Sequence, residues 1–414
     1  MAAVSKISNG KKWHDLYPEL GTEPIPIDPY VSHECFERER ALIFRKVWLN
    51  VGRVEQIPKP GDYFVRDLAV CNTSILIVRG KDSTIRAFHN MCAHRGNKLV
   101  AEASGTCKGL FTCKFHGWAY GLDGTLRHIA DEESFFNLNK QALGMTPISV
   151  DTWEGFIFIN IDPHPSETLS DYLGEFGTGF CGYPFSELSG TQFFWQTELK
   201  ANWKVIKDAF QEVWHIPSLH HKTIPNVFAE PANKHGHALN FKLFARHGQI
   251  SLPGNYERTP TTVEGFALRY GSGATVIQQP NSVTPKGVNA ARDPRWSIDG
   301  NAIFPNCLLY VAERTFLTHI FWPLAADRTL WEARFYYPKA ETLAQRFSQE
   351  YAKVILRDVN LEDGSTLERT QTMLASGAKQ EIVLQDQELL IRHHHKVAEA
   401  YLKAQYGTPK EHNH

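Results

Sequence analysis

The chain has 414 residues with nearly balanced charge, 44 Lys and Arg against 45 Asp and Glu. At about 150 residues per domain this length predicts two or three domains. The absence of a basic run gives no electrostatic footprint for nucleic acid or an anionic membrane. Aromatic residues make up 12%, which excludes an intrinsically disordered chain.

Seven cysteines, odd in number and scattered, argue against a secreted disulfide scaffold. No apolar stretch follows the N-terminal lysines, so we expect no signal peptide. The longest apolar runs, such as residues 75–78, are far too short to span a bilayer. We therefore expect a cytoplasmic protein with no membrane or nucleic-acid partner.

The first 162 residues predict an arm followed by a β-rich segment. Residues 14–30 are irregular, and the apolar spacing of residues 32–47 predicts a helix. From about residue 50 to 162 the chain shows short strand-like runs separated by Gly, Pro and Asp, which is typical of a small all-β domain. The four clearest runs are YFVRDLAV, SILIVRG, TIRAFHN and GFIFINI.

The remaining residues predict a mixed α+β domain. Helical patterns cover 196–216, 340–376 and 380–406, the last with an exposed His-Lys face, and strand patterns cover 239–251 and 308–337. We expect three parts: an N-terminal helical arm (1–45) that packs on the third part, a β-rich domain (46–162) and an α+β domain (163–414).

The β-rich segment contains two short Cys/His motifs, Cys92-x-His94 and Cys113-x-x-His116. Two thiolates and two imidazoles indicate a metal site. A structural zinc site is the alternative, but zinc fingers pair Cys with Cys and His with His. One Cys and one His on each loop instead suit a binuclear cluster in which one iron takes both sulfurs and the other both imidazoles.

The stretch CAHRGNKL … CKFHGWAYGLDG resembles the signature of the Rieske non-heme iron oxygenases, large (α) subunit. The resemblance implies a 2Fe–2S cluster held by Cys92, His94, Cys113 and His116. Eighteen residues separate His94 from Cys113, slightly more than is usual, and they include Cys107, which we expect to be a spare buried thiol.

A second group of metal-ligand residues lies in NWKVIKDAFQEVWHIPSLHH, residues 202–221. On a helix Glu212 and His215 share a face. Pro217 should end or bend that helix and return His220 to the same point. Two imidazoles and one carboxylate form the facial triad of non-heme Fe(II) oxygenases. His221 is an alternative to His220 that the spacing disfavours.

The third ligand must be a carboxylate from far along the chain, and Asp358, Glu362, Asp363 and Asp386 are candidates. NLEDGSTLERTQTMLASG resembles the closing motif of the family, which implies Asp363 as the ligand together with His215 and His220. The same resemblance makes Glu212 the acid that bridges to the Rieske centre. Most members carry Asp there, and Glu occurs in choline- and carnitine-type monooxygenases. Asp208 either supports this bridge or is an exposed acid on the helix face.

The resemblance implies an α+β fold with an all-β Rieske domain set into a larger catalytic domain on an antiparallel sheet of the helix-grip type. It implies a terminal oxygenase that uses O₂ and takes electrons from NADH or NADPH through a separate reductase, with or without a ferredoxin. The assembly would be a head-to-tail homotrimer, or a hexamer with a small β subunit. Glu212 would then contact His94 or His116 of the partner subunit.

The expected reaction is hydroxylation or dihydroxylation of an aromatic or alicyclic compound, as in aromatic hydrocarbon catabolism. Monooxygenation or oxidative demethylation of a quaternary amine is the alternative, and an electron carrier without catalysis is a further one. Gly177–Gly182 has the letters of a dinucleotide motif but follows no convincing strand, so we expect no nucleotide site. His393–His395 is interpreted as a solvated face.

We expect the substrate cavity to be lined from residues 223–330, and Arg246, Arg269 or Arg292 to be candidates for a substrate carboxylate. The apolar candidates are Phe228, Phe241, Leu243, Phe244, Leu268, Val276, Ile303, Phe304 and Leu309.

Overall fold

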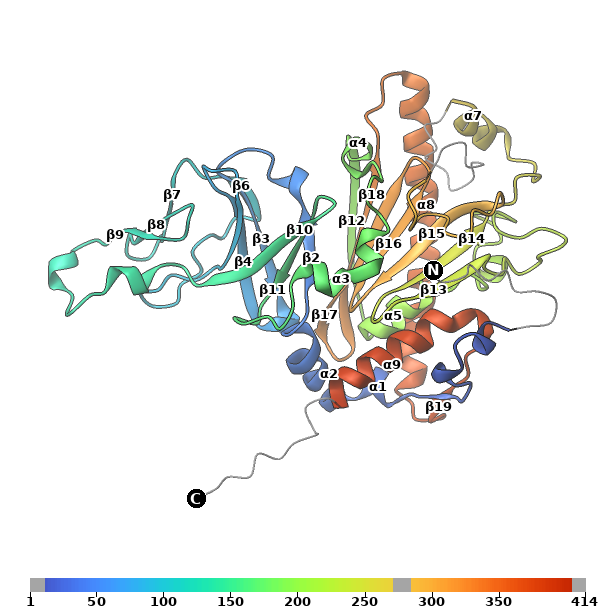
Figure 1. Cartoon of the computed structure of the whole chain (residues 1–414), viewed down its shortest axis with the longest axis horizontal. Helices are drawn as coiled ribbons and strands as arrows, with labels where there is room; N and C mark the ends of the chain where they lie inside the picture. Colours follow the sequence, from blue (N-terminus) through green and yellow to red (C-terminus); the bar gives the residue numbers. More distant parts are fainter. Residues whose placement is uncertain (1–11, 271–283, 404–414) are drawn as a thin grey trace. The chain divides into compact units, whose positions relative to one another are not determined.

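The computed structural model describes residues 12–270 and 284–403, and the chain forms two compact units (Figure 1). One unit is Arg40–Tyr172, and the other combines Met1–Glu39 with Leu173–His414. The chain therefore starts in the second unit, leaves it to build the whole of the first and then returns. The predicted iron–sulfur domain, residues 46–162, lies within the first unit.

The first unit is built on β-strands. Seven antiparallel strands form one sheet in the order β2-β11-β10-β5-β4-β3-β6, and a smaller sheet has the order β7-β8-β9. Residues 75–78 of β4 have no exposed surface, which explains their continuous apolar run. The strands are β2 Leu49–Arg53, β3 Asp62–Leu68, β4 Thr73–Arg79, β5 Ile85–His89, β6 Ser104–Thr106, β7 Leu110–Thr112, β8 Ala119–Gly121, β9 Leu126–His128, β10 Pro147–Trp153 and β11 Phe156–Asn160.

The second unit is built on another seven-stranded antiparallel sheet, in the order β12-β18-β17-β16-β15-β14-β13. Its central strands bury large aromatic side chains such as Trp296, Phe321 and Trp331. Ile25–Pro26 (β1) and Glu381–Ile382 (β19) pair separately. The strands of the large sheet are β12 Thr191–Leu199, β13 Asn240–Leu243, β14 Gly248–Pro253, β15 Trp296–Ile303, β16 Cys307–Ala312, β17 Phe316–Ala325 and β18 Arg328–Tyr337.

The longest helix, α8, contacts this sheet through β12 (orange in Figure 1). Thr342 Oγ1 accepts the N–H of Gln345, and Gln345 Oε1 accepts the N–H of Thr342, so a capping box fixes the start of α8. No helix in residues 12–270 and 284–403 has the length and apolar character to cross a membrane. The α-helices are α1 Asp28–Val31, α2 His33–Glu39, α3 Leu169–Thr178, α4 Phe185–Leu188, α5 Trp203–Ala209, α6 Ile216–Leu219, α7 Thr262–Tyr270, α8 Leu343–Leu374 and α9 Leu389–Lys403.

The α+β class, the four strands named above and the long helix are confirmed. The helix predicted at 196–216 is wrong in part, because Thr191–Leu199 forms an edge strand and only Trp203–Ala209 is helical. Burial alternates along that strand, which is the strand period. The helix predicted at 380–406 begins only at Leu389.

A buried ion pair joins the N-terminal segment to α5 in the second unit. Lys204 Nζ lies 2.7 and 2.9 Å from the two carboxylate oxygens of Glu39, and the indole N–H of Trp203 donates to the same carboxylate at 3.0 Å. Both charged side chains are 1% exposed. Removing one charge from such a pair leaves the other buried without compensation.

We therefore expect Glu39→Gln to lower the free energy of unfolding by about 3 kcal/mol. Glu34→Gln, which changes an exposed acid of the same helix, should alter it by less than about 0.5 kcal/mol. Urea denaturation followed by tryptophan fluorescence measures both values, and equal effects of the two substitutions would contradict a structural role for the pair.

Candidate functional site

Two matching turns carry the Cys/His motifs of the first unit. The N–H of Gly96 donates to the carbonyl of Cys92 at 2.9 Å, and the N–H of Gly117 donates to the carbonyl of Cys113 at 3.0 Å. Gly96 and Gly117 have φ of 74° and 73°, a backbone conformation that glycine adopts readily. Both cysteines are free thiols and 2% exposed. The turns therefore hold two buried sulfurs in equivalent surroundings.

The two histidines of these motifs lie side by side. The ring centroids of His94 and His116 are 4.6 Å apart, and His94 stacks on Trp118 at 5.0 Å. His94 Nδ1 is buried and has no hydrogen-bond partner among the described residues. Burial and the neighbouring His116 and Arg95 lower the pKa of His94, which favours the neutral imidazole that binds metals. An orphaned ring nitrogen beside a second imidazole fits a metal ligand.

Polar groups also surround the two sulfurs. The N–H of Ala93 donates to the Tyr120 hydroxyl at 2.9 Å, which leaves the hydroxyl proton to donate to Cys92 Sγ at 3.2 Å. Asn97 Nδ2 donates to Cys113 Sγ at 3.5 Å. Burial opposes ionisation of Cys113, but the hydrogen bonds to its sulfur prevail and lower its pKa. This donor set fits a cluster with thiolate and imidazole ligands.

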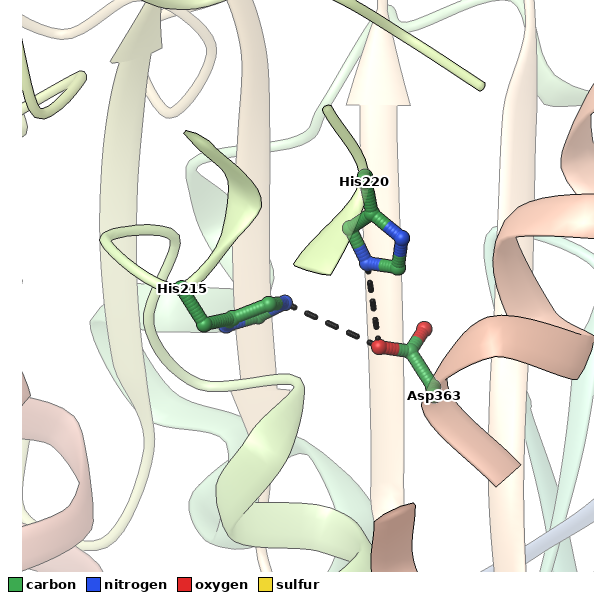
Figure 2. A group of neighbouring side chains, drawn as sticks. All are labelled: His215, His220 and Asp363. Carbon is green, nitrogen blue, oxygen red and sulfur yellow. Dashed lines mark hydrogen bonds and ion pairs between the residues drawn. The ribbon is translucent and has the colours of Figure 1, made fainter. Parts of the chain in front are cut away.

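In the second unit His215, His220 and Asp363 converge, and one possible ligand atom from each lies within 4.8 Å of the others (Figure 2). Asp363 Oδ1 is 3.1 Å from His220 Nε2 and 3.7 Å from His215 Nε2. Asp363 extends from α8, nearly 150 residues beyond the histidines. Two imidazole nitrogens and one carboxylate with open space beside them fit a 2-His-1-carboxylate metal site.

Each of these imidazoles is held by a second carboxylate at its other nitrogen. Glu212 contacts Nδ1 of His215, and Glu362 Oε2 lies 2.7 Å from Nδ1 of His220. An N–H at Nδ1 leaves the lone pair of Nε2 pointing toward Asp363, as a metal ligand requires. Burial lowers the pKa of His220, but the carboxylates of Asp363 and Glu362 outweigh it, so the pKa is raised. The sequence reasoning treated Glu362 only as a rival ligand and missed this orienting contact.

The local structure around Glu212 differs from the prediction. Helix α5 ends at Ala209, so Glu212 and His215 lie in the turn that follows it and not on one helix. Pro217 does not end a helix but lies in the first turn of α6, where its missing N–H costs nothing. Glu212 Oε2 also accepts the backbone N–H of His215 at 3.3 Å, which keeps the two side chains together without a helix.

The other candidate ligands lie elsewhere. Asp358 pairs with Arg357, Asp386 accepts the N–H groups of Trp13 and His14, and His221 is exposed and bonded to the Ser218 carbonyl. Asp208 is not an exposed helix-face acid.

Asp208 is 8% exposed, and its carboxylate accepts the Tyr30 hydroxyl at 2.6 Å and lies 3.3 Å from His395.

The expectation of a solvated His393–His395 face is wrong. His394 is 3% exposed and its Nδ1 lies 2.7 Å from Lys207 Nζ, while His393 Nε2 contacts the His247 carbonyl. Packing of α9 against α5 and β14 therefore buries these rings.

The buried Lys207 is expected to make the free energy of unfolding depend on pH. Burial lowers its pKa from 10.5 to about 7, partly opposed by Asp208 and Cys307, with His394 as the neighbour on α9. Between these values the unfolded chain binds the proton that the folded chain has lost, so raising the pH favours folding by about 1 kcal/mol per unit. We expect Lys207→Met to flatten this slope between pH 7 and 9 in urea denaturation; an unchanged slope would contradict the shift.

A cavity of about 160 Å³ lies directly beside His215, His220 and Asp363. Its walls come from the turn after α5, the sheet, the segment before α7 and the inner face of α8. Of the nine predicted apolar residues, Phe228 lines it, and Val276 lies outside the described residues. The main apolar lining residues are Val213, Ile216, Ile224, Val227, Phe228, Leu252, Ile298, Leu317, Ile355, Leu356 and Val359.

One ion pair lies in the cavity wall. Arg258 contacts Glu264 through both terminal nitrogens, and the two side chains are 9% and 12% exposed. None of the predicted Arg246, Arg269 and Arg292 is among the lining residues. Apart from His215, His220, Asp363 and Glu212, the described wall is mostly apolar, and its one ion pair is internally compensated. The polar side chains that also line it are Thr223, Tyr310, Thr315, His319, Tyr351 and Asn360.

Two family comparisons cover most of the chain. Residues 47–143 match the Rieske [2Fe-2S] domain. Residues 192–404 match the ring hydroxylating alpha subunit (catalytic domain), and this second match alone covers just over half of the chain. The Cys/His motifs fall in the first match and the His215–His220–Asp363 group in the second.

Two curated relatives are similar to part of the chain. The carnitine monooxygenase oxygenase subunit of Acinetobacter baumannii is 36% identical over 194 residues, 46% of this chain and 51% of the relative. The large oxygenase component of the naphthalene 1,2-dioxygenase system of Pseudomonas aeruginosa is 32% identical over 260 residues, 59% of this chain and 51% of the relative. The chain spans about half the length of the curated relatives it matches.

Solved structures share the fold over nearly the whole chain. A quaternary ammonium Rieske monooxygenase has a TM-score of 0.70 at 23% identity and covers 98% of this chain and 100% of its own. Naphthalene 1,2-dioxygenase from Rhodococcus sp. has a TM-score of 0.71 at 18% identity, with 96% and 97% coverage. With the two family matches, this confirms the resemblance found in the sequence: the chain belongs to the Rieske-type ring-hydroxylating oxygenase family, as a large (α) subunit.

Proposed function

We propose that the chain is the terminal oxygenase component of a multicomponent Rieske oxygenase that hydroxylates or dihydroxylates a single-ring aromatic or alicyclic compound. The observation that carries this proposal is the apolar cavity bordered by His215, His220 and Asp363. An electron carrier needs no such group and no substrate cavity, so we favour an enzyme over an electron-transfer protein. A role in aromatic hydrocarbon catabolism, in the cytoplasm, is part of the proposal.

The proposed ligands of the Rieske cluster are Cys92, His94, Cys113 and His116, and those of the mononuclear Fe(II) are His215, His220 and Asp363. When bound, the cluster supplies single electrons and the mononuclear iron activates O₂. The chain's own groups do the positioning: carboxylates at Nδ1 orient the imidazoles of the second site, and the apolar wall excludes water from it.

Glu212 is the proposed bridge for electrons that arrive from the cluster of a neighbouring chain. It is 8% exposed, contacts His215 and also lines a second cavity of about 170 Å³ together with Asp208. The bridge fits a head-to-tail homotrimer in which Glu212 meets His94 or His116 of the partner subunit. Asp208 supports the bridge by fixing the end of α5 through Tyr30 and His395. A reductase, with or without a ferredoxin, supplies electrons from NADH or NADPH.

The size and charge of the cavity favour an uncharged ring. A dry cavity of about 150 Å³ with aliphatic and aromatic walls holds benzene in another protein, and the cavity here is about 160 Å³. The charges of Arg258 and Glu264 offset each other. A small apolar ring therefore meets complementary walls, whereas a charged substrate would lose its hydration.

Monooxygenation or oxidative demethylation of a quaternary amine is the second candidate. It is supported by the 36% identity to a carnitine monooxygenase oxygenase subunit and by Glu212, since the acid at the bridge is Glu in enzymes of that type. Phe228 and Tyr351 are aromatic lining residues that could contact an ammonium group.

A substrate panel with ¹⁸O₂ separates these possibilities. The chemically reduced holoenzyme is mixed with ¹⁸O₂ and either ethylbenzene, cyclohexene or carnitine, and products are analysed by mass spectrometry. We expect labelled products from the rings, with two labelled hydroxyls after dioxygenation and one after monooxygenation. Oxidation of carnitine alone would replace the first proposal by the second.

A further inference from the structure

His319 is a buried histidine in the cavity wall that the proposed mechanism does not use. It lies on β17, is 3% exposed and lines the cavity beside the metal-binding group. Its ring stacks on Phe210, with centroids 4.8 Å apart. Burial lowers the pKa of His319 to about 3, so the imidazole is neutral and carries one N–H near neutral pH.

A neighbouring tryptophan determines which ring nitrogen carries that hydrogen. The indole nitrogen of Trp331 donates to Nδ1 of His319 at 2.9 Å. An indole N–H can only donate, so Nδ1 must accept and has no hydrogen. The single hydrogen of the neutral ring therefore lies on Nε2.

This Nε2–H is available to a ligand. Within residues 12–270 and 284–403, Nε2 of His319 has no hydrogen-bond partner, and Trp331, which holds the opposite nitrogen, is not among the lining residues. The ring is thus anchored through Nδ1 by a side chain that is not among the lining residues, while His319 itself lines the cavity. An N–H in apolar surroundings without an acceptor is costly, so a bound acceptor gains affinity there.

A second unsatisfied polar side chain lines the same cavity from α8. Asn360 is 4% exposed and lies one turn before Asp363. Its Nδ2 is buried without a partner among the described residues. By contrast, the Tyr310 hydroxyl in this wall donates to the Phe210 carbonyl and is occupied. Two unsatisfied hydrogen-bond donors among the lining residues of one mostly apolar cavity point to a ligand that carries an acceptor.

We propose that His319 and Asn360 form a hydrogen-bonding subsite for a neutral oxygen on the substrate ring, such as an ether or carbonyl oxygen. The inference rests on the proposed function and specifies its substrate class. A carboxylate is less suitable, since His319 is uncharged and Arg258 is already neutralised by Glu264. A ring bound through this oxygen would lie in the same cavity that His215 and His220 line.

The test compares two probes of equal size. Anisole and ethylbenzene have the same number of heavy atoms and differ in one oxygen, which can only accept a hydrogen bond. Their dissociation constants are measured by equilibrium dialysis with iron-loaded wild-type protein. Two matched variants change His319. In His319→Asn the side-chain oxygen can still accept the hydrogen bond from Trp331, but the donor at the Nε2 position is lost. His319→Gln keeps a donor at the Nε2 position. Asn360→Ala tests the second member.

We expect wild-type protein to bind anisole about five-fold more tightly than ethylbenzene. His319→Asn should remove this preference while leaving ethylbenzene binding similar, His319→Gln should keep part of it, and Asn360→Ala should reduce it. Equal affinities of the wild type for the two rings, or an unchanged preference in His319→Asn, would overturn the inference. The proposed function would still stand if the enzyme oxidised both rings. If neither ring bound, both the inference and the proposed function would be overturned.

Discussion

Replacing Glu212 with alanine is expected to lower product formation by about 100-fold, while both metal centres keep their iron. The reason is the position of Glu212, whose carboxylate is in contact with His215 Nδ1, so that it can couple this imidazole to a group outside the site. The atoms proposed to bind iron, Nε2 of both histidines and Asp363, are not removed by the substitution. The expected defect is therefore in electron delivery and not in metal binding.

The readout is oxidation of the reduced cluster after mixing with O₂ and substrate, followed by EPR, with iron content determined in parallel. Glu362→Ala is the matched control, because Glu362 holds the other imidazole in the same way but has no proposed part in electron transfer. Both variants are compared per molecule that retains mononuclear iron. We expect the cluster to stay reduced in Glu212→Ala and to be oxidised in Glu362→Ala. Normal turnover of Glu212→Ala would remove it from the electron path.

Asp363→Ala is expected to lower the iron content from about three atoms per chain to about two. Asp363 is the only carboxylate among the described residues whose oxygen lies within 4.8 Å of ligand nitrogens from both His215 and His220. The four residues proposed to bind the cluster lie in the other unit of the chain, so the EPR signal of the cluster should be unchanged.

Metal analysis of Asp363→Ala is compared with that of Asp358→Ala, which changes an acid of the same helix that pairs with Arg357. The control should keep all its iron. Full iron occupancy in Asp363→Ala would show that another acid is the third ligand, and Glu362 would then be the first to test, because it already contacts His220.

The Cys/His turns could be predicted from the sequence because all their elements are local. Cys92 and His94 are two residues apart, and Cys113 and His116 are three apart. Each turn also has its own glycine with positive φ, so a short stretch of sequence is enough to predict the geometry of each turn. The four clearest strand-like runs and the 32-residue helix could also be predicted, because their apolar spacing is visible within a short stretch of sequence.

Other features depend on contacts between distant residues. Glu362 reaches Nδ1 of His220 across 142 positions, and His394 is buried because Lys207, on α5, packs against it. His319 and Asn360 belong to a strand and a helix that border one cavity only after folding. The sequence pattern wrongly predicted that the helix continues through Glu212. Glu212 and His215 are three residues apart, a spacing typical of a helix, but here a hydrogen bond from the backbone of His215 to the Glu212 side chain holds them together in a turn.

A single turnover in the absence of any reductase distinguishes an oxygenase from an electron carrier. The iron-loaded chain, reduced chemically, is mixed with O₂ and ethylbenzene, and oxygenated product and the EPR signal of the cluster are quantified in the same sample. We expect oxygenated product in amounts comparable to the protein, together with loss of the EPR signal of the reduced cluster. Loss of that signal without any product from the ring would contradict it and would instead indicate a carrier of electrons.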